Sequence, residues 1–411
     1  MRRLIAPPGV FWLLLLLSTV VGGVIVTISG SALRYADELD YFALAQQLIA
    51  GRGYVDPEGF PTAYRPPGYP LLMALFASWP HGVVLIKLLN LMFLAGAMML
   101  IRHLVSTTTP HVAWLAGGAM LAYPAWLYTA STLYPQTLCM LLLLAVVALL
   151  LRRSDYWVTM VGCGLLLGAL ILIAPSFQLL APFLGLYVVL AGPLNWWRNL
   201  AAAMLFAAVA GLTISPWLLR NYQVFGQFVP VATNGGVNLL LGNSEFSGAN
   251  TGVNVDVAHY MSQVQGLNEV DASRKLQEFA VSWVKSHPGD AAVLYVRKLI
   301  NYFNFRAELA TASMSSTWKD WLMFLTYYPL LLVVVVRLTF ARQQPLTRTE
   351  MVLGGLYLCN AFLAALFFTR IRFRLPFDGL LMAWAIISVG HLVNMLPMVR
   401  LRRSVTKCHP V

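Results

Sequence analysis

Long apolar runs dominate this chain and limit the folds open to it. The first run extends from about Val10 to Ile28, which is the length that an α-helix needs to cross a bilayer. Similar runs predict nine further spans, at about residues 82–101, 111–130, 132–151, 157–174, 177–194, 199–218, 318–336, 350–368 and 376–395. Only 11% of the residues are charged, against about a quarter in an average globular protein. We therefore predict an all-α polytopic membrane protein with about ten transmembrane helices.

The first run allows two interpretations. Met1-Arg2-Arg3 precedes it and Gly30-Ser31-Ala32 follows it, a pattern that a cleaved signal peptide would also show. The run is longer than the usual core of a signal peptide, so an uncleaved first span is favoured. The basic N-terminus then stays in the cytoplasm.

The distribution of basic residues predicts the orientation of the chain. With alternating spans, one side receives Arg2, Arg3, Arg102, Arg152, Arg153, Arg198, Arg337, Arg342, Arg348, Arg400, Arg402, Arg403 and Lys407. The positive-inside rule makes this side cytoplasmic. Residues 31–80 and 219–317 then form two extracytoplasmic loops of a single unit that spans residues 1–411. Topology accounts for most of the net charge of +12, so no nucleic-acid partner is predicted.

Both loops contain helical patterns. In the first loop, apolar residues recur at helical spacing from Leu39 to Ile49, and Gly51 ends the pattern. This predicts an amphipathic helix on the membrane surface. The second loop is predicted to be a mixed, mainly helical outer cap. It would contain a short strand or extended piece at Val229–Val231, followed by helices at about 271–286 and 290–305.

An acidic pair opens the first surface helix. Asp37 and Glu38 could simply complement the helix dipole. They lie just outside a predicted span, however, where a carboxylate could meet a substrate whose tail lies in lipid and act as a general base. The residues by themselves favour the two interpretations about equally.

Arginines near the other span ends are candidate phosphate ligands. Arg220 and Asn221 follow a span, where an arginine can snorkel to headgroups or bind a phosphate. Arg370, Arg372 and Arg374 lie together on the outer side, against the topological bias. In an extended segment all three would point to one side. A headgroup or a bound lipid phosphate would explain them, and the bound phosphate is favoured.

Several familiar chemistries are absent from the sequence. There is no Walker loop, GxSxG or HExxH motif, and the seven His are scattered. The four Cys show no CxxC and no disulfide framework.

Three stretches resemble a known family. They are DELDYFALAQQLIAGRGY with TAYRPPGYPLLMALF, then SPWLLRNYQVFGQFVPVATNGGVNLLLGN, and finally RIRFRLPFDGLLM. In residues, order and spacing the chain resembles the membrane-embedded glycosyltransferases of the GT-C superfamily that use polyprenyl-phosphate sugars, such as protein O-mannosyltransferases and lipid A aminoarabinose transferases. The likeness extends over most of the chain, although the chain lacks the large C-terminal soluble domain of the bigger members.

The resemblance implies roles for particular residues. The family's first-loop Asp acts in catalysis and corresponds to Asp37, and the basic residue before Pro-Pro corresponds to Arg65. Tyr41 and Tyr64, in the same motifs, become candidate substrate-binding residues. Some members bind a divalent metal near the first loop; this sequence shows no convincing ligand set, so a metal ion is left open.

The resulting hypothesis is an inverting glycosyltransferase. It would move a sugar from a polyprenyl-phosphate carrier to a hydroxyl of a protein, lipid or glycan acceptor, on the outer side of the cytoplasmic membrane. The alternative is a transporter or flippase for a lipid-linked anion, which would often show repeated halves; no repeat is visible. A membrane assembly subunit without enzymatic activity is a third interpretation.

Overall fold

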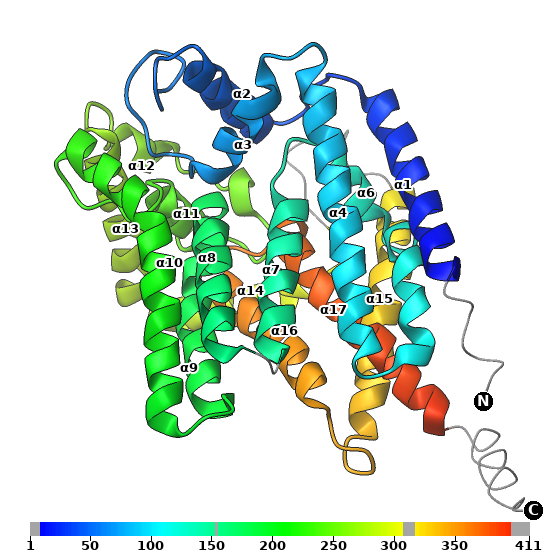
Figure 1. The fold of residues 1–411 in the computed structure, drawn as a ribbon. Helices are drawn as coiled ribbons and strands as arrows, with labels where there is room; N and C mark the ends of the chain where they lie inside the picture. The colour runs from blue at the N-terminus through cyan, green and yellow to red at the C-terminus, as the bar shows by residue number, and fades with distance from the viewer. Residues whose placement is uncertain (1–8, 153–154, 307–316, 396–411) are drawn as a thin grey trace, which may run out of the picture.

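The protein is a bundle of long helices with two smaller layers at one end (Figure 1). The computed structural model describes residues 9–152, 155–306 and 317–395. Within them, six helices are long and apolar enough to cross a membrane: α1 (Gly9–Ser29), α4 (Gly82–Ser106), α8 (Tyr156–Ile173), α10 (Trp196–Phe225), α15 (Thr317–Thr339) and α17 (Ile371–Met395). The shorter α7 (Gln136–Leu151), α9 (Ala181–Ala191) and α16 (Arg348–Ala365) pack among them. The all-α membrane fold is confirmed, whereas the number of ten spans stays a prediction.

The predicted span at 111–130 is not one helix. It is divided into a 3₁₀ helix, η1 (Pro110–Gly118), and two short helices, α5 (Ala119–Ala122) and α6 (Pro124–Ala130). Pro124 lacks the N–H that would continue the α-helical ladder. Gly117 lies so close to α1 that a Cβ there would be 2.5 Å from the carbonyl oxygen of Phe11. Close packing on α1 therefore accompanies the break.

Helix α17 forms the centre of the bundle. Its side chains are buried along most of its length, and it packs against α7, α15, α16 and α4. Arg374 and Asp378 form an ion pair at 3.1 Å inside it, and the hydroxyl of Tyr123 donates to Asp378 at 2.8 Å. A buried charge pair of this kind is tolerated because each charge also has hydrogen-bond partners.

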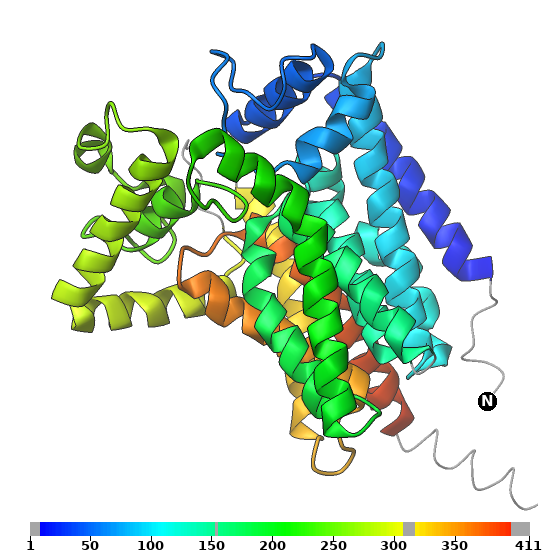
Figure 2. The same cartoon turned by 60° about the vertical axis from the view of Figure 1, so that its left-hand side comes forward.

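The first loop forms the layer above the bundle in Figures 1 and 2. Helix α2 (Ala36–Ile49) begins and ends close to the predicted limits and packs against α3 (Gly68–Ala77). At the opposite end of the bundle, α9 connects to α10 and α15 connects to α16. Arg198 and Arg348, at the starts of α10 and α16, therefore lie at the end away from α2. The predicted cytoplasmic residues Arg2, Arg3, Arg153 and those beyond 395 lie outside the described residues.

The second loop forms the cap beside the first. It contains α11 (Gly235–Gly242), η3 (Gly252–Asn254), α12 (Ala258–Ser262), α13 (Glu269–Ser286) and α14 (Pro288–Tyr302). The break between the two predicted helices falls at His287, and Pro288 starts α14, as proline often does. Glu269 ties the cap to the first loop, because its carboxylate accepts from the hydroxyl of Thr62 at 2.6 Å and from the N–H of Ala63 at 2.9 Å.

Of the two forms predicted at Val229–Val231, a short strand or an extended piece, the strand is not formed. Across the described residues, the ladder pairing is limited to one isolated bridge between Val55 and Pro61. The segment is instead held by side chains, since the indole of Trp217 donates to the carbonyl of Val231 at 2.7 Å. An apolar pattern of this length does not distinguish a strand from a buried loop fixed by its neighbours.

Candidate functional site

Asp37 lies where three elements meet at the α2 end of the bundle. Its Oδ1 is 2.5 Å from Nη2 of Arg65, in the loop before α3, and its Oδ2 forms an ion pair with Nη1 of Arg372, in the first turn of α17. Arg65 also contacts Asp40 at 2.7 Å. We refer to Asp37, Asp40, Arg65 and Arg372 as the Asp37 cluster. Two predicted candidates from opposite ends of the sequence thus contact the same carboxylate.

Local structure fixes the direction of these side chains. Asp37 is the second residue of α2, so its carboxylate lies in the first helical turn. The hydroxyl of Tyr54 donates to the carbonyls of Arg65 and Pro66, at 3.0 and 3.1 Å. This holds the segment before the two prolines against the protein. The cluster is therefore built on backbone that is held by hydrogen bonds within the protein.

The electrostatics of the cluster keep Asp37 ionised. Burial alone would raise the pKa of its carboxyl group, but the positive charges of Arg372 and Arg65 outweigh that effect and hold the pKa below its ordinary value. Burial would likewise lower the pKa of Arg65, and the charge of Asp37 reverses the direction. The two arginines thus favour the ionised form of Asp37.

Aromatic rings flank the two arginines. The guanidinium of Arg65 lies 5.5 Å from the ring centroid of Tyr41 and 5.1 Å from that of Tyr64. Arg372 lies 5.5 Å from the ring centroid of Tyr134 and donates to its hydroxyl at 3.2 Å. Contacts of this type orient guanidinium groups. The predicted Tyr41 and Tyr64 therefore belong to the wall of the site, through Arg65.

The three arginines near α17 do not share one face, contrary to the extended arrangement predicted for them. Helix α17 begins at Ile371, so Arg372 and Arg374 are two residues apart on a helix and point to nearly opposite sides. Arg372 meets Asp37, whereas Arg374 is 1% exposed and pairs with Asp378. Arg370 precedes the helix. The alternation of arginine and apolar residues reflects a helix start inside the bundle rather than a strand-like clamp.

Arg372 retains one donor. Its Nε is buried and has no hydrogen-bond partner among the described residues. A buried N–H without a partner costs free energy. Its side chain is 28% exposed overall, so part of Arg372 remains accessible at the surface. An anion that reached the Nε would complete its hydrogen bonding.

Glu38 has a different position from its neighbour. It is fully buried, and its carboxylate accepts from the backbone N–H groups of Arg34, Tyr35 and Leu133 at 2.8, 3.0 and 2.7 Å. These contacts cap the start of α2 and attach it to the segment before α7. This geometry is that of an anchoring carboxylate, so within the acidic pair it is Asp37 that faces the arginines.

Arg220 and Asn221 hold the first loop and the cap. Arg220 donates to the carbonyls of Thr62 and Tyr54 at 2.8 and 2.7 Å, and its guanidinium lies 4.8 Å from a ring centroid of Trp217. Asn221 is fully buried and donates to the carbonyl of Val229 at 3.2 Å. Both candidates thus contact protein backbone, and they do not join the Asp37 cluster.

Two polar residues of the site were missing from the sequence-based candidates. Asp40 follows Asp37 at the helical spacing i, i+3, so the sequence does contain a signal that places the two carboxylates on one side of the helix. Tyr134 lies between α6 and α7 and has no neighbouring motif that marks it. Its role depends on an approach to Arg372 across 238 positions of sequence, which no local pattern indicates.

Beside Arg370 lies a small polar pocket. It is lined by Asn250, Asn301, Tyr302, Asn304, Arg306, Thr369, Arg370, Ile371 and Arg374, and its volume of about 10 Å³ suits a single water molecule. Within the described ranges, no group of three or more His, Cys, Asp or Glu residues could hold a metal ion. Asp37 and Asp40 are two carboxylates that both contact Arg65, and we derive no step through a metal.

Comparison with solved structures shows which known membrane proteins have a similar fold. The fold is similar to that of the Archaeoglobus fulgidus oligosaccharyltransferase in its apo form, with a TM-score of 0.56 and 13% identity over 98% of this chain and 53% of that one. The chain therefore spans about half the length of that protein. A structure of ArnT from Cupriavidus metallidurans bound to undecaprenyl phosphate has a TM-score of 0.45 and 13% identity, over 94% of this chain and 78% of that one. No curated protein matches the chain.

A family model matches the sequence directly. The model of glycosyltransferase family 87 matches residues 64–284, which is more than half of the 411 residues. The matched range includes Arg65 and most of the cap, and it decides between the enzyme and the transporter that the sequence left open. The chain therefore belongs to glycosyltransferase family 87 and is a multi-pass membrane glycosyltransferase.

Proposed function

We propose that the protein transfers a sugar from a polyprenyl-phosphate carrier to an acceptor hydroxyl, with inversion at the anomeric carbon. The observation that carries this proposal is the pairing of one carboxylate, Asp37, with two arginines, Arg65 and Arg372. A glycosyl phosphate donor needs both kinds of group. A base must take the proton of the acceptor, and cations must stabilise the phosphate that leaves.

The position of the cluster suits a lipid-linked donor. Asp37 lies in α2, above the end of the helical bundle, and Arg372 lies at the first turn of the central span. A carrier can keep its isoprenoid tail in the bilayer while its phosphate reaches the guanidinium groups. The buried Nε of Arg372, which lacks a partner among the described residues, would donate to a phosphate oxygen.

The chemical step is a single displacement. The acceptor oxygen bonds to the anomeric carbon as the bond from that carbon to the phosphate oxygen breaks. The hydroxyl proton passes to Asp37, and the polyprenyl phosphate departs with both electrons of the broken bond. Arg372 and Arg65 stabilise the additional negative charge on the phosphate.

Donor binding also adjusts the base. With its pKa held low by two arginines, Asp37 is a poor proton acceptor in the ligand-free protein. A phosphate that takes hydrogen bonds from Arg372 draws part of that positive charge away from Asp37. The pKa of Asp37 then rises toward its ordinary value of about 3.9, so the carboxylate becomes more basic when the donor is present.

The direct test of this function is product analysis with purified protein in proteoliposomes. We expect sugar transfer from polyprenyl-phosphate sugars and none from nucleotide sugars, with an inverted anomeric configuration when the product is examined by NMR. Transfer from nucleotide sugars alone would overturn the donor class. A retained configuration would overturn the single displacement.

We also propose that the Asp37 cluster faces the outside of the cytoplasmic membrane. Glu58, in the loop between α2 and α3, and Arg198, at the start of α10, are both exposed and belong to opposite ends of the bundle. A membrane-impermeant thiol reagent should label a cysteine that replaces Glu58 in intact cells and spare one that replaces Arg198. The reverse pattern would place the site in the cytoplasm.

A further inference from the structure

A larger cavity lies at the other end of the bundle, between α7, α9 and α16. Its volume is about 630 Å³, within the range of about 300–1,000 Å³ that is typical of ligand sites. The lining is mostly apolar and includes Leu150, Phe183, Leu184, Val352 and Leu356. Along α16 the lining extends from Arg348 to Cys359, which at about 1.5 Å per residue is about 16 Å. The cavity is therefore elongated along the bundle, as a hydrocarbon chain would require.

Arg348 lies at one end of this cavity. Its Nε donates to the hydroxyl of Tyr187 at 2.7 Å, and its Nη2 donates to the carbonyl of Ala191 at 3.2 Å. In the part of the chain that the structure describes, no carboxylate forms an ion pair with Arg348. Two neutral groups thus orient the guanidinium, and its positive charge is not balanced by a carboxylate of the described residues.

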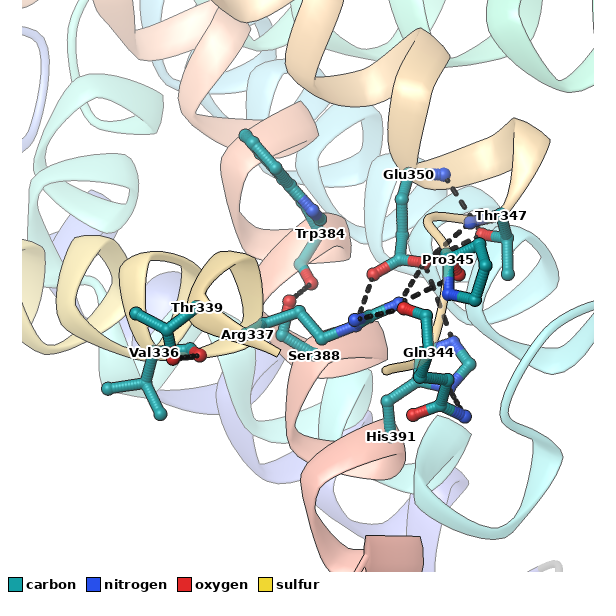
Figure 3. Close-up of polar contacts among 10 residues, drawn as sticks. All are labelled: Val336, Arg337, Thr339, Gln344, Pro345, Thr347, Glu350, Trp384, Ser388 and His391. Atoms are coloured by element: carbon teal, nitrogen blue, oxygen red, sulfur yellow. Dashed lines mark hydrogen bonds and ion pairs between the residues drawn. The ribbon is translucent and has the colours of Figure 1, made fainter. Parts of the chain in front are cut away.

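The acidic residue nearest to Arg348 in sequence does not neutralise it. Glu350 is fully buried, and Arg337 donates to both of its carboxylate oxygens, at 2.9 and 3.2 Å (Figure 3). The N–H of Thr347 donates to the same group at 2.8 Å. The N-terminus of α16, where Arg348 is the first residue, adds partial positive charge. The mouth of the cavity is consequently electropositive.

Exposed aromatic residues indicate where the mouth of the cavity lies relative to the membrane surface. Trp196 and Trp197 are 55% and 63% exposed at the start of α10, a few residues beyond Ala191, whose carbonyl contacts Arg348. Exposed tryptophans gather where the bilayer meets water. Arg348 therefore lies at the level of the headgroups, and the apolar part of the cavity extends from there into the hydrocarbon region.

We propose that this cavity binds a phospholipid with an anionic headgroup, in the leaflet opposite the Asp37 cluster. One acyl chain occupies the groove along α16, and the headgroup phosphate accepts hydrogen bonds from Arg348. A net negative headgroup is preferred over a zwitterionic one because the arginine has no carboxylate partner. The site is separate from the glycosyl-transfer site and does not depend on the donor proposed above.

The cavity offers a variant that fills it without disturbing the fold. Gly355 lines the cavity, and a Cβ added there would meet no atom within 4 Å. Gly211, on α10, is equally open and lies outside the cavity lining. Gly355→Phe should therefore block the groove, while Gly211→Phe adds the same ring to another exposed helix face. Arg348→Gln removes the charge at the mouth.

The experiment is native mass spectrometry of delipidated full-length protein titrated with phosphatidylglycerol or phosphatidylethanolamine. Wild type and Gly211→Phe should bind one phosphatidylglycerol molecule tightly, with at least about tenfold preference over phosphatidylethanolamine. Gly355→Phe should weaken that binding at least about tenfold, and Arg348→Gln should abolish the preference. Equal phosphatidylglycerol affinity in Gly355→Phe and Gly211→Phe would overturn the groove, even if Arg348→Gln failed to fold. Equal affinity of the wild type for the two lipids would overturn the role of the charge.

Discussion

Two clusters of arginine and carboxylate lie at opposite ends of the bundle. They differ in their exposure and in whether every guanidinium nitrogen has a hydrogen-bond partner. In the cluster of Arg337 and Glu350, both side chains are fully buried, and Nε, Nη1 and Nη2 of Arg337 all donate hydrogen bonds (Figure 3). In the Asp37 cluster, Arg372 is 28% exposed and its Nε has no partner among the described residues. The first cluster is closed by the protein, whereas the second keeps a partly exposed arginine with one donor that lacks a partner in the described chain.

Under the proposed function, this difference separates a structural ion pair from one that takes part in the reaction. Arg337 joins α15 to the connection before α16, since it also donates to the carbonyls of Gln344 and Pro345 at 2.8 and 3.1 Å. A buried pair of this kind is strongly destabilising to break. The arginines of the Asp37 cluster come from separate segments and share a carboxylate that is 18% exposed. Charge alone, then, does not identify the site; exposure and an unused donor do.

The largest expected effect is on stability, at the closed cluster. Arg337→Gln leaves Glu350 buried without its charge partner, and we expect a loss of about 3–5 kcal/mol in the free energy of unfolding. Thermal unfolding in detergent would show it as a lower Tm. Arg337→Met combined with Glu350→Met should recover much of the loss, because both charges are then removed. A Tm for Arg337→Gln equal to that of the wild type would break the comparison.

At the open cluster, the effect should be on donor binding rather than on folding. Arg372→Lys keeps the charge and loses the planar fork and the free Nε. We expect the affinity for a polyprenyl-phosphate analogue to fall by about 1–3 kcal/mol, with little change in Tm. Arg374→Lys serves as the contrast, since Arg374 pairs with Asp378 in the core and should affect stability. If Arg372→Lys bound the analogue as well as the wild type, a phosphate contact at Arg372 would be rejected.

A smaller effect is expected at Glu38. Its three backbone contacts resemble a helix cap, which is worth about 0.5–2 kcal/mol. Glu38→Gln should therefore lower Tm modestly, while turnover at a temperature where the variant is folded stays within about tenfold of the wild type. A loss of turnover as large as that of an Asp37 variant would instead make Glu38 part of the chemistry.

Sequence patterns predicted the elements whose ends carry strong local signals. Helix α2 ends before Gly51, and α13 and α14 divide at His287-Pro288, as composition indicated. The prediction of a single helix at 111–130 was wrong. The segment is divided into shorter helices, and Gly117 within it packs closely on α1. Local periodicity indicates which residues are buried. It does not indicate which helix packs closely against a given glycine.

The site was predictable in part. Asp37 and Arg65 lie in motifs of the first loop, and both lie in the cluster. The sequence predicted that three arginines would act together: Arg370, Arg372 and Arg374. In the structure a helix starts at Ile371 in place of the extended form, and it directs Arg372 and Arg374 to different sides. The contact of Arg372 with Asp37 joins residues 335 positions apart. Contacts of this kind follow from the packing of α17 in the bundle. The sequence around either residue does not predict them.

The most direct test of the account is single-turnover transfer by Asp37→Asn. Asparagine keeps the shape and removes the charge, so the variant should still bind the lipid-linked donor while transfer falls at least about a hundredfold, as expected for the loss of a general base. Asp40→Asn is the matched control, because Asp40 contacts the same Arg65 and is 45% exposed; it should lose much less. The measurement is the release of polyprenyl phosphate from a bound donor in the presence of acceptor. Near-normal release by Asp37→Asn would contradict the central claim that this carboxylate takes the proton.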